Sequence, residues 1–317
     1  MGEFDLIDRY FRRPATRSPL GVGDDCALLA PAPGMQLAVS CDMLVEGRHF
    51  LSTTDPARLG HKCLAVNLSD LGACGAEPLA FTLALALPQA DDAWLAPFAR
   101  GLFALADEHR CELVGGDTTR GPLNICITVF GQVPAGQALL RSGARAGDDI
   151  YVSGTLGDAR LALDVFRGTV SVPAEVFEAA RARLELPTPR VALGLALRGI
   201  ATSAIDISDG LAGDLGHILQ QSGVGATVAA EAVAGLLATP PVLTAQQRLE
   251  YALAGGDDYE LAFTAARAQR DAVTAAARQA QVAVRRIGQI EAGPGLRIVD
   301  RDGRPVATHA ASFDHFA

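Results

Sequence analysis

The spacing of hydrophobic residues predicts how the chain begins. Apolar residues three and four apart favour a helix over residues 4–13, which Pro14 ends. Two short apolar stretches follow, over residues 26–30 and 37–40, and a turn rich in proline and glycine joins them. We therefore expect one helix and then two strands that pair with each other.

The segments that follow mix helices with strands. Pro56, at the first helical position, opens a helix to about Ala73, and Asp91 is placed to cap a helix that ends near His109. Apolar runs predict strands over residues 79–87, 111–114 and 124–133. Because strands and helices are mixed in one block, an α+β fold is favoured over a regular β-α-β array.

A change in composition near residues 134–147, to glycine, alanine, arginine and proline, indicates a domain boundary. The length of 317 residues agrees with about two domains, and we place them at residues 1–135 and 136–317. The second domain begins with a strand over residues 150–153. Its further helices are expected over 157–167, 173–185, 190–199, 209–222 and about 265–280, and its further strands over 203–207, 259–263, 282–290 and 296–299.

Composition excludes several classes of function. Acidic residues outnumber basic ones by 36 to 27, and the net charge of −9 argues against binding of nucleic acid through a basic face. The only lysine, Lys62, has no glycine loop before it and no serine or threonine after it. A P-loop requires Gly-Lys-Ser/Thr and a protein kinase requires a strand lysine, so both kinds of ATP site are excluded.

The sequence favours a cytoplasmic protein that does not bind a membrane. The N-terminus lacks the basic and then apolar regions of a secretory signal, and the longest apolar run, residues 79–87, is about half a membrane span. Six cysteines occur without any Cys-x-x-Cys spacing. We expect them to be buried, reduced thiols, since a disulfide scaffold or a zinc ribbon would space them differently.

Aspartate residues stand beside glycine or serine at the expected junctions between elements. A single such aspartate is most often a turn residue or a helix cap. Here the arrangement occurs six times, over residues 21–25, 40–42, 67–70, 115–118, 206–210 and 255–258. Several of these segments directly follow an expected strand, and strand ends are where sheet proteins place ligand sites.

Carboxylates gathered in one place need cations to neutralise them near pH 7. Oxygen ligands favour Mg²⁺ or Mn²⁺ over zinc, and Mg²⁺ held by carboxylates usually takes phosphate oxygens as well. Gly115 and Gly116 would let backbone N–H groups approach a phosphate closely. Asp206 and Ser208 are two apart and are expected to face the same way from a strand, while Asp209 is placed to cap the next helix. That segment lacks the spacing and the closing glutamate of a calcium loop.

Arginine side chains would have to neutralise the charge of a bound phosphate, because no lysine is suitably placed. Arg120 follows the Gly-Gly-Asp segment, and Arg141 lies near the expected domain boundary. We favour Arg141, since a guanidinium in a cleft between domains could clamp a polyphosphate. His49 stands close after Asp42 and is a further candidate. No motif of a covalent nucleophile is present, so positioning and electrostatics would carry catalysis, as they can in phosphoryl transfer.

The ordered set of motifs resembles one family. The motifs are Gly-Val-Gly-Asp-Asp-Cys-Ala, Asp-Met-Leu-Val-Glu-Gly-Arg-His-Phe, Ala-Val-Asn-Leu-Ser-Asp-Leu-Gly-Ala, Gly-Gly-Asp-Thr-Thr-Arg-Gly, Arg-Ser-Gly-Ala, Asp-Ile-Ser-Asp-Gly-Leu and Gly-Gly-Asp-Asp-Tyr-Glu-Leu. In this order they are similar to the thiamine-monophosphate kinase family, within the aminoimidazole ribonucleotide synthetase superfamily. The resemblance runs from the N-terminal Gly-Glu-Phe to the final Phe-Asp-His-Phe and covers nearly the whole chain.

The resemblance implies a fold and a reaction. The fold is a two-domain, synthetase-like α+β fold, with an N-terminal α+β domain that dimerises through its sheets and a C-terminal α/β domain that closes over the ligands. The reaction is direct in-line transfer of the γ-phosphate of ATP to the phosphate of thiamine monophosphate, without a covalent phosphoenzyme. Several Mg²⁺ ions are implied as cofactors, and a need for K⁺ stays open. The expected partners are the two substrates and a second copy of the chain.

The family's site positions carry over residue by residue. The resemblance implies catalytic roles for Asp42, Asp117 and Arg141, and contacts with ATP for Gly116, Asp117, Arg141 and Ser208. It places His49, Asp257 and Phe313 on the side of thiamine monophosphate. The implied metal positions are Asp25, Ser40, Cys41, Asp42, Asp70, Asp117, Asp206 and Asp209. Three residues depart from the family pattern: Cys41 stands where threonine is common, Asp257 where glutamate is usual, and Phe313 where tyrosine is often found.

Two other interpretations stay open at this point. One is another ATP-dependent synthetase of the same superfamily. Selenophosphate synthetase is disfavoured, because no cysteine stands beside a glycine-rich N-terminal segment with a lysine, and the contexts of His49 and Phe313 disfavour the purine-pathway synthetase. The other is a regulatory module that binds nucleotide or metal without turnover, which would need only part of the aspartate set.

Overall fold

A computed structural model of the chain describes residues 2–239 and 242–308. The chain divides into two compact units. The first comprises Met1–Leu71 and Ala76–Gly136, and the second comprises Gly72–Gly75 and Gln137–Ala317. The first unit ends at Gly136, and the second resumes at Gln137. The transfer of Gly72–Gly75 to the second unit has no signal in the sequence.

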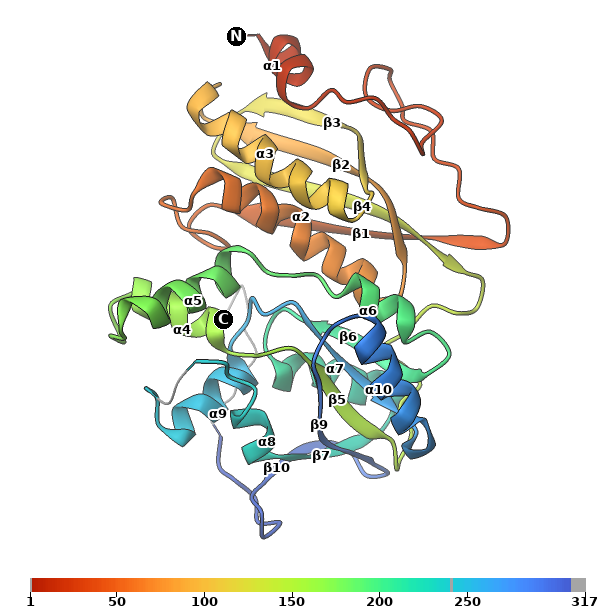
Figure 1. Cartoon of the computed structure of the whole chain (residues 1–317), viewed down its shortest axis with the longest axis vertical. Coiled ribbons are helices and arrows are strands. Elements are labelled where there is room, and N and C mark those ends of the chain that lie inside the picture. The colour runs from red at the N-terminus through yellow and green to blue at the C-terminus, as the bar shows by residue number, and fades with distance from the viewer. Residues whose placement is uncertain (1, 240–241, 309–317) are drawn as a thin grey trace. The chain divides into compact units, whose positions relative to one another are not determined.

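The N-terminal unit is a four-stranded mixed sheet with helices on one face. Its helices are α1 (Glu3–Tyr10), α2 (Pro56–Ala73) and α3 (Asp92–Glu108), and its strands are β1 (Met35–Val45), β2 (Glu77–Leu87), β3 (Glu112–Arg120) and β4 (Asn124–Pro134). The strand order is β1-β4-β2-β3, in which β2 and β3 are parallel and the other pairs antiparallel. Helices α2 and α3 lie over the sheet (Figure 1), and Asp91 caps α3 by accepting a hydrogen bond from the Ala93 N–H, as predicted.

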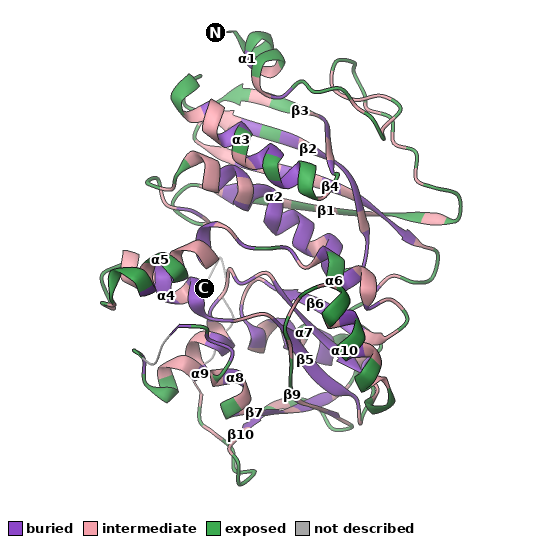
Figure 2. Cartoon of the chain, viewed as in Figure 1, coloured by how far each residue is buried: buried purple, intermediate pink, exposed green. Residues whose placement is uncertain are grey.

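The two faces of this sheet differ in burial. Ile125, Ile127 and Val129 of β4 are fully buried on the helix-covered face. On the opposite face β1 stays open, and Val39 and Met43 expose 57% and 53% of their surface. Figure 2 shows the same contrast along β1, where exposed and intermediate residues follow one another. An antiparallel strand with one covered face alternates in this way.

The C-terminal unit is built on a six-stranded sheet of order β10-β7-β9-β5-β8-β6, in which only β10 and β7 pair in parallel among the described residues. Its strands are β5 (Asp149–Ser153), β6 (Ala201–Ile207), β7 (Gly225–Ala229), β8 (Glu260–Ala265), β9 (Val284–Glu291) and β10 (Gly295–Val299). Its helices are α4 (Asp158–Phe166), α5 (Ala174–Glu185), α6 (Val191–Ala196), α7 (Leu211–Ser222), α8 (Ala230–Ala234), α9 (Ala245–Ala254) and α10 (Arg270–Gln279), with a short 3₁₀ helix, η1 (Arg267–Gln269), before α10.

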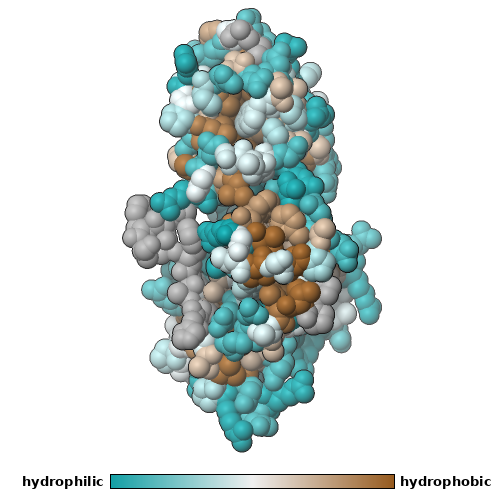
Figure 3. Space-filling view, turned by 90° about the vertical axis from the view of Figure 1, so that its left-hand side faces the viewer, coloured by the Kyte–Doolittle hydropathy of each residue, from teal (hydrophilic) through white to brown (hydrophobic). Residues whose placement is uncertain are grey.

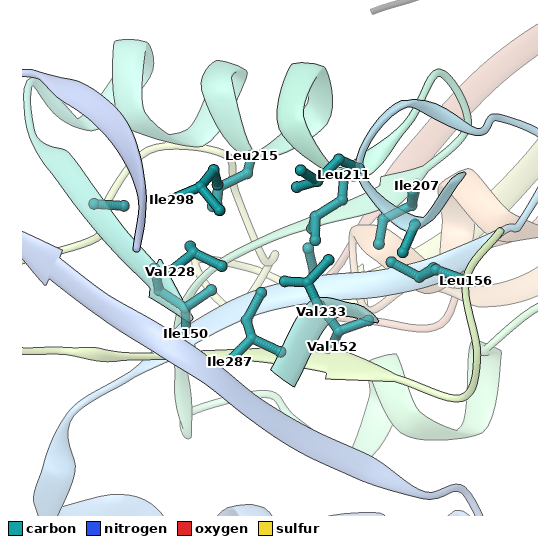
Figure 4. Close-up of a cluster of buried hydrophobic side chains, with 14 of the residues drawn as sticks. Ile150, Val152, Leu156, Ile207, Leu211, Leu215, Val228, Val233, Ile287 and Ile298 are labelled. Carbon is teal, nitrogen blue, oxygen red and sulfur yellow. The ribbon is translucent and has the colours of Figure 1, made fainter. Parts of the chain in front are cut away.

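Apolar side chains cover both faces of this second sheet. Ile150 and Val152 of β5 pack toward Leu211 and Leu215 of α7, in the cluster drawn in Figure 4. Between them, Tyr151 points to the other face, in a cluster that α6 and α10 complete. All five residues of β5 are therefore buried, which is typical of a sheet between two helical layers. Hydrophobic side chains also gather on the side of the unit where α4 and α5 lie (Figure 3).

Several sequence-based predictions about the elements are wrong. Residues 26–30 form no strand, and residues 37–40 do not pair with them, since β1 pairs with β4 along its whole length. Both β1 and β3 are longer than expected, so Asp42 and Asp117 lie inside strands and not after them. Strand β7 and the helices α8 and α9 were missed. Small residues give β7 and α8 little hydrophobic periodicity.

The predicted burial of the cysteines holds for two of the six. Cys63 and Cys111 are buried, while Cys26, Cys41 and Cys74 are exposed and Cys126 is intermediate. All six are free thiols. No helix in the described part of the chain has the length and hydrophobicity of a membrane span.

Candidate functional site

Strand β1 and helix α2 hold the first group of predicted site residues. The Ser40 hydroxyl donates a hydrogen bond of 2.5 Å to the Asp70 carboxylate, which joins the two elements. Two residues further along β1, the Asp42 N–H donates a hydrogen bond to Oδ1 of Asn67 at 3.0 Å. Asn67 is fully buried and donates from its own amide to the Cys63 carbonyl at 2.9 Å. The structure thus brings Ser40, Asp42 and Asp70 together on the helix-covered side of the sheet.

The pairing register connects this group with the Gly-Gly-Asp segment of β3. Asp42 pairs with Ile127 of β4, Ile127 with Leu83 of β2, and Leu83 with Gly116 of β3. Asp42 and Gly116 therefore lie in one row across the sheet, three strand spacings of about 4.8 Å apart. Two motifs that are far apart in the sequence therefore lie at the same level of one sheet, on β1 and β3, with β4 and β2 between them.

Gly116 holds a backbone conformation that other residues rarely adopt. Its φ is +147°, and a Cβ atom there would lie 1.9 Å from the Leu83 carbonyl oxygen. Gly115 has no such restriction, because a Cβ on it would meet only a methyl group of Thr82, at 3.9 Å. The glycine that the sequence singled out for close approach to a ligand is thus also required by the contact between β3 and β2.

An open cavity of about 590 Å³ lies in the N-terminal unit and reaches Asp25, Gly116 and Asp117. It is also lined by Phe4 of α1 and by Arg12. The Arg12 guanidinium, which forms an ion pair with Asp8 at 2.8 Å, passes within 4 Å of the position that a Cβ on Gly23 would take. Sequence reasoning missed Arg12, since a lone arginine after a helix carries no motif.

Glu112 fixes the segment that leads from Arg12 toward residues 23–25. Its carboxylate accepts hydrogen bonds from the hydroxyl and N–H of Thr16 and from the N–H groups of Arg17 and Ser18, at 2.6 to 3.0 Å. Partial burial would raise the pKa of Glu112, but these donors outweigh it and lower the pKa to about 2. The charged carboxylate therefore stays in place as an anchor for the cavity wall.

Cys41 points away from the predicted metal group. Ser40 and Asp42 contact α2, and the alternation along β1 places Cys41 on the opposite face, where its Sγ lies 3.4 Å from Sγ of Cys126 on β4. Burial, together with the neighbouring Cys41, raises the pKa of Cys126 to about 11. The Cys41 thiol therefore does not face the group that Ser40, Asp42 and Asp70 form.

His49 lies in a tight turn at the end of β1. Its Nδ1 accepts a hydrogen bond from the Val45 N–H at 3.0 Å, and its own N–H donates to the Val45 carbonyl at 3.0 Å. In its neutral form the imidazole therefore carries its proton on Nε2. The turn fixes the ring close after Asp42 in the chain, with its Nε2–H as a potential donor.

The C-terminal unit positions Asp206, Ser208 and Asp209 by a means that the sequence did not indicate. Asp206 is buried at the end of β6, and Ser208 already lies beyond the strand, so the expected strand alternation does not relate the two. Asp209 does not cap α7, whose N-cap is Gly210. The Asp214 carboxylate of α7 instead accepts from the N–H groups of Ser208 and Asp209, at 3.0 and 3.1 Å. Burial raises the pKa of Asp214 to about 7.

Asp257 lies directly against this loop. Its N–H donates to the Ser208 carbonyl at 2.9 Å, and the Tyr259 N–H donates to the Ile207 carbonyl at 2.8 Å. Asp257 itself is half-buried. The segment that carries Asp257 and the loop that carries Ser208 are therefore adjacent within one unit.

Buried hydrogen bonds and ion pairs fix the segment that carries Asp257. Both oxygens of Asp258 accept the Gly157 N–H at 3.0 Å, and Glu260 is fully buried between Arg183 and Arg190, with contacts of 2.8 and 2.5 Å. Burial raises the pKa of Asp258 well above its usual value. Sequence reasoning assigned no role to Arg183, Arg190 or Glu260, since the two arginines are distant in the chain from the motif that they support.

Arg141 is exposed, and its backbone carbonyl accepts a hydrogen bond from the Ser222 hydroxyl at 3.2 Å. The same hydroxyl accepts from the N–H groups of Gly143 and Ala144 at 3.1 and 3.2 Å. The loop is therefore fixed while the guanidinium is left at the surface. Phe313 lies outside the described residues.

The described residues contain no three His, Cys, Asp or Glu side chains arranged to hold a metal ion. The only lysine is 3% exposed, on α2, so it does not face solvent as a phosphate ligand would. The predicted metal positions of the N-terminal unit are nonetheless carboxylate, hydroxyl and carbonyl oxygens, which are the donors that Mg²⁺ prefers.

The chain matches two family descriptions in order. AIR synthase related protein, N-terminal domain, matches residues 23–133, and AIR synthase related protein, C-terminal domain, matches residues 145–301. Thiamine-monophosphate kinase of Salmonella typhimurium is 48% identical over 321 residues, which cover 100% of this chain and 98% of that protein.

The chain is also similar to solved structures over nearly its whole length. The crystal structure of thiamine-monophosphate kinase from Stenotrophomonas maltophilia K279a has a TM-score of 0.84 and 46% identity, over 96% of each chain. The structure of AaThiL complexed with AMPPCP and TMP has a TM-score of 0.75 and 29% identity, over 90% of this chain and 89% of that one. These similarities extend over both units, with their mixed helices and sheets, and the chain therefore belongs to the thiamine-monophosphate kinase family.

Proposed function

We propose that the protein transfers the γ-phosphate of ATP to the phosphate of thiamine monophosphate and releases thiamine diphosphate and ADP. One observation carries the proposal: the Asp257 N–H donates to the Ser208 carbonyl at 2.9 Å, so the residues expected on the acceptor side and on the ATP side are adjacent. A regulatory module that only binds nucleotide has no need of this adjacency. The related structure with AMPPCP and TMP supports the same pair of ligands.

In the N-terminal unit, the proposal assigns phosphate binding to the Gly-Gly-Asp segment of β3. The cavity of about 590 Å³ brings Gly116 and Asp117 together with Asp25 and Arg12. Backbone N–H groups and a guanidinium would stabilise the polyphosphate charge, and no covalent intermediate is needed for an in-line transfer. His49 would contribute its Nε2–H to the thiamine monophosphate side.

In the C-terminal unit, Ser208 would contact ATP and Asp257 would contact thiamine monophosphate. The exposed Arg141 would meet polyphosphate charge, on a loop that Ser222 holds in place. These residues would position the acceptor phosphate in line with the γ-phosphate, and positioning of this kind is the main contribution of a protein to phosphoryl transfer. Phe313 would complete the acceptor side.

We propose that Mg²⁺ ions accompany ATP. When bound, Mg²⁺ neutralises phosphate charge and orients the transferring group. In the N-terminal unit Asp25, Ser40, the Cys41 carbonyl, Asp42, Asp70 and Asp117 would serve as ligands, and in the C-terminal unit Asp206 and Asp209. Ser40 already donates to Asp70 at 2.5 Å, so a cation bound by Asp70 would share that carboxylate with a hydroxyl donor. A cytoplasmic location belongs to the same proposal, since the reaction consumes ATP.

The turnover of the purified protein tests this proposal. With ATP, MgCl₂ and thiamine monophosphate we expect equal amounts of ADP and thiamine diphosphate, measured by chromatography. EDTA in excess over Mg²⁺ should stop both products, and MgCl₂ in excess over EDTA should restore them. ADP release at the same rate without thiamine monophosphate would contradict the proposed transfer and favour an ATPase.

We also propose that the protein forms a homodimer through the open face of its first sheet. This outer sheet face comprises Leu37, Val39, Cys41 and Met43 of β1 and Cys126, Thr128 and Phe130 of β4. Val39 and Met43 are more than half exposed, and Val39 pairs directly with Phe130, so the apolar surface is continuous across two strands. An exposed apolar patch of this kind is typical of a protein–protein interface, and a second copy would cover it with the same residues.

Substitution of Val39 by aspartate should disrupt this dimer. A carboxylate on the outer sheet face would be buried without a partner, so we expect V39D to sediment as a monomer while the wild-type protein sediments as a dimer. The control is V242D, because Val242 is also an exposed valine, at 43%, but lies in the C-terminal unit. A monomeric wild-type protein, or a dimeric V39D protein, would contradict the proposed interface.

A further inference from the structure

The segment that carries Asp257 holds two strained residues. Asp257 has a φ of +65° and Tyr259 a φ of +52°, and neither is a glycine. Residues with side chains occupy this left-handed region rarely, and they persist there only where the surrounding structure holds them. Two of the four positive-φ residues other than glycine in the described chain therefore stand one residue apart, on either side of Asp258.

Buried contacts account for how this strain is maintained. Asp258 and Glu260 point inward, where both oxygens of Asp258 accept the Gly157 N–H and Glu260 accepts from Arg183, Arg190 and Ser153. Asp257 and Tyr259, which alternate with them in the chain, are half-buried. Asp258 and Glu260 thus hold the backbone in its strained conformation. That conformation in turn places the side chains of Asp257 and Tyr259.

The side chains of Asp257 and Tyr259 contact each other. The Tyr259 hydroxyl donates a hydrogen bond to Oδ1 of Asp257 at 3.2 Å. The Asp257 carboxylate stands on a single methylene, so it has a short reach and few rotatable bonds. A phenol on a rigid ring, held from the same strained segment, fixes Oδ1 of that carboxylate in one place.

We propose that Tyr259 is a positioning residue that orients the Asp257 carboxylate toward thiamine monophosphate. The inference rests on the proposed function, because it takes Asp257 as a contact of the acceptor. Thiamine monophosphate carries a thiazolium cation and an amino group, and a carboxylate can recognise either. An oriented carboxylate binds such a group without first losing side-chain freedom, so the hydroxyl should act on the affinity for the acceptor.

The substitution Tyr259→Phe removes the hydroxyl and keeps the ring. We expect KM for thiamine monophosphate to rise about three- to tenfold, with kcat and KM for ATP within about twofold of the wild-type values. The equilibrium Kd of thiamine monophosphate in the absence of ATP, measured by calorimetry, should rise by the same factor. The matched control is Tyr251→Phe, which removes a half-buried hydroxyl that donates to Asp164 at 2.7 Å in the same unit, and which should leave all three constants unchanged.

A double-mutant cycle distinguishes positioning from a structural role. If the hydroxyl acts through the carboxylate, Tyr259→Phe should have less than about a twofold effect on KM and Kd in an Asp257→Ala background, which has no side-chain acceptor for the hydroxyl. An equal effect in both backgrounds would overturn the proposal, and so would a Tyr259→Phe protein with unchanged KM and Kd beside an Asp257→Ala protein in which both rise. A wild-type protein that neither binds nor phosphorylates thiamine monophosphate would overturn the proposed function itself, and the inference with it.

Discussion

The substitution Asp42→Asn should lower kcat for thiamine diphosphate formation by about two to four orders of magnitude while the protein stays folded. Asparagine has nearly the same shape, and the Asp42 backbone is held by its N–H bond to Asn67, which the change does not touch. The variant therefore removes one negative charge from the row that Asp42 shares with Gly116 and leaves the sheet intact. Initial rates at saturating substrates, with circular dichroism as a check on folding, measure the effect.

A second aspartate of the same unit provides the control. Asp107 forms an exposed ion pair with Arg13 at 2.8 Å, and exposed pairs of this kind contribute little to stability. Asp107→Asn should keep kcat within about twofold of the wild-type value. If Asp42→Asn turned over near the wild-type rate, Asp42 would have to be removed from the proposed catalytic group.

The substitution Gly116→Ala should have the largest effect on both structure and activity. The added methyl group would lie 1.9 Å from the Leu83 carbonyl oxygen, and alanine would also have to take a φ of +147°. Strain and overpacking together should lower the free energy of unfolding by about 3 kcal/mol or more, because backbone on an adjacent strand cannot move aside as a side chain can. Since β3 also carries Asp117, turnover should be lost even in the fraction that folds.

Gly115→Ala is the matched control for this effect. Its methyl group would have open space apart from one contact of 3.9 Å with Thr82, and the residue needs no positive φ. We expect its free energy of unfolding, measured by urea denaturation, to lie within about 1 kcal/mol of the wild-type value. Equal destabilisation by the two alanine variants would show that the Leu83 contact does not restrict the segment.

Local patterns in the sequence were sufficient for most helices and for the residue types at the site. Asp91 caps α3 and Pro56 begins α2 because both effects depend on residues within one helical turn. The partner of β1 could not be found in this way. It is β4, which begins at Asn124, and a pairing over that separation depends on which strands share a core, not on local periodicity.

The same limit applies to the loops of the candidate site. The residues around Asp209 predict that it caps the next helix. In the structure Gly210 is the N-cap, and the Asp214 carboxylate accepts hydrogen bonds from the N–H groups of the loop. Glu260 belongs to a recognisable motif, yet its partners Arg183 and Arg190 come from segments about 70 residues earlier in the chain. A buried carboxylate requires such partners, but nothing in the motif indicates which arginines provide them.

The sequence by itself determined the family, the acidic and glycine-rich chemistry of the site, and the exclusion of lysine-based ATP sites, because these depend on which residues are present and in which order. Only the tertiary structure decided that Asp42 and Gly116 share one row of a sheet, that the Cys41 thiol faces away from that group, and that Tyr259 meets Asp257 from a strained turn. These facts depend on strand register, on the alternation of side chains across a sheet and on buried ion pairs between distant segments. Each is set when the whole core forms and not by neighbours in the chain.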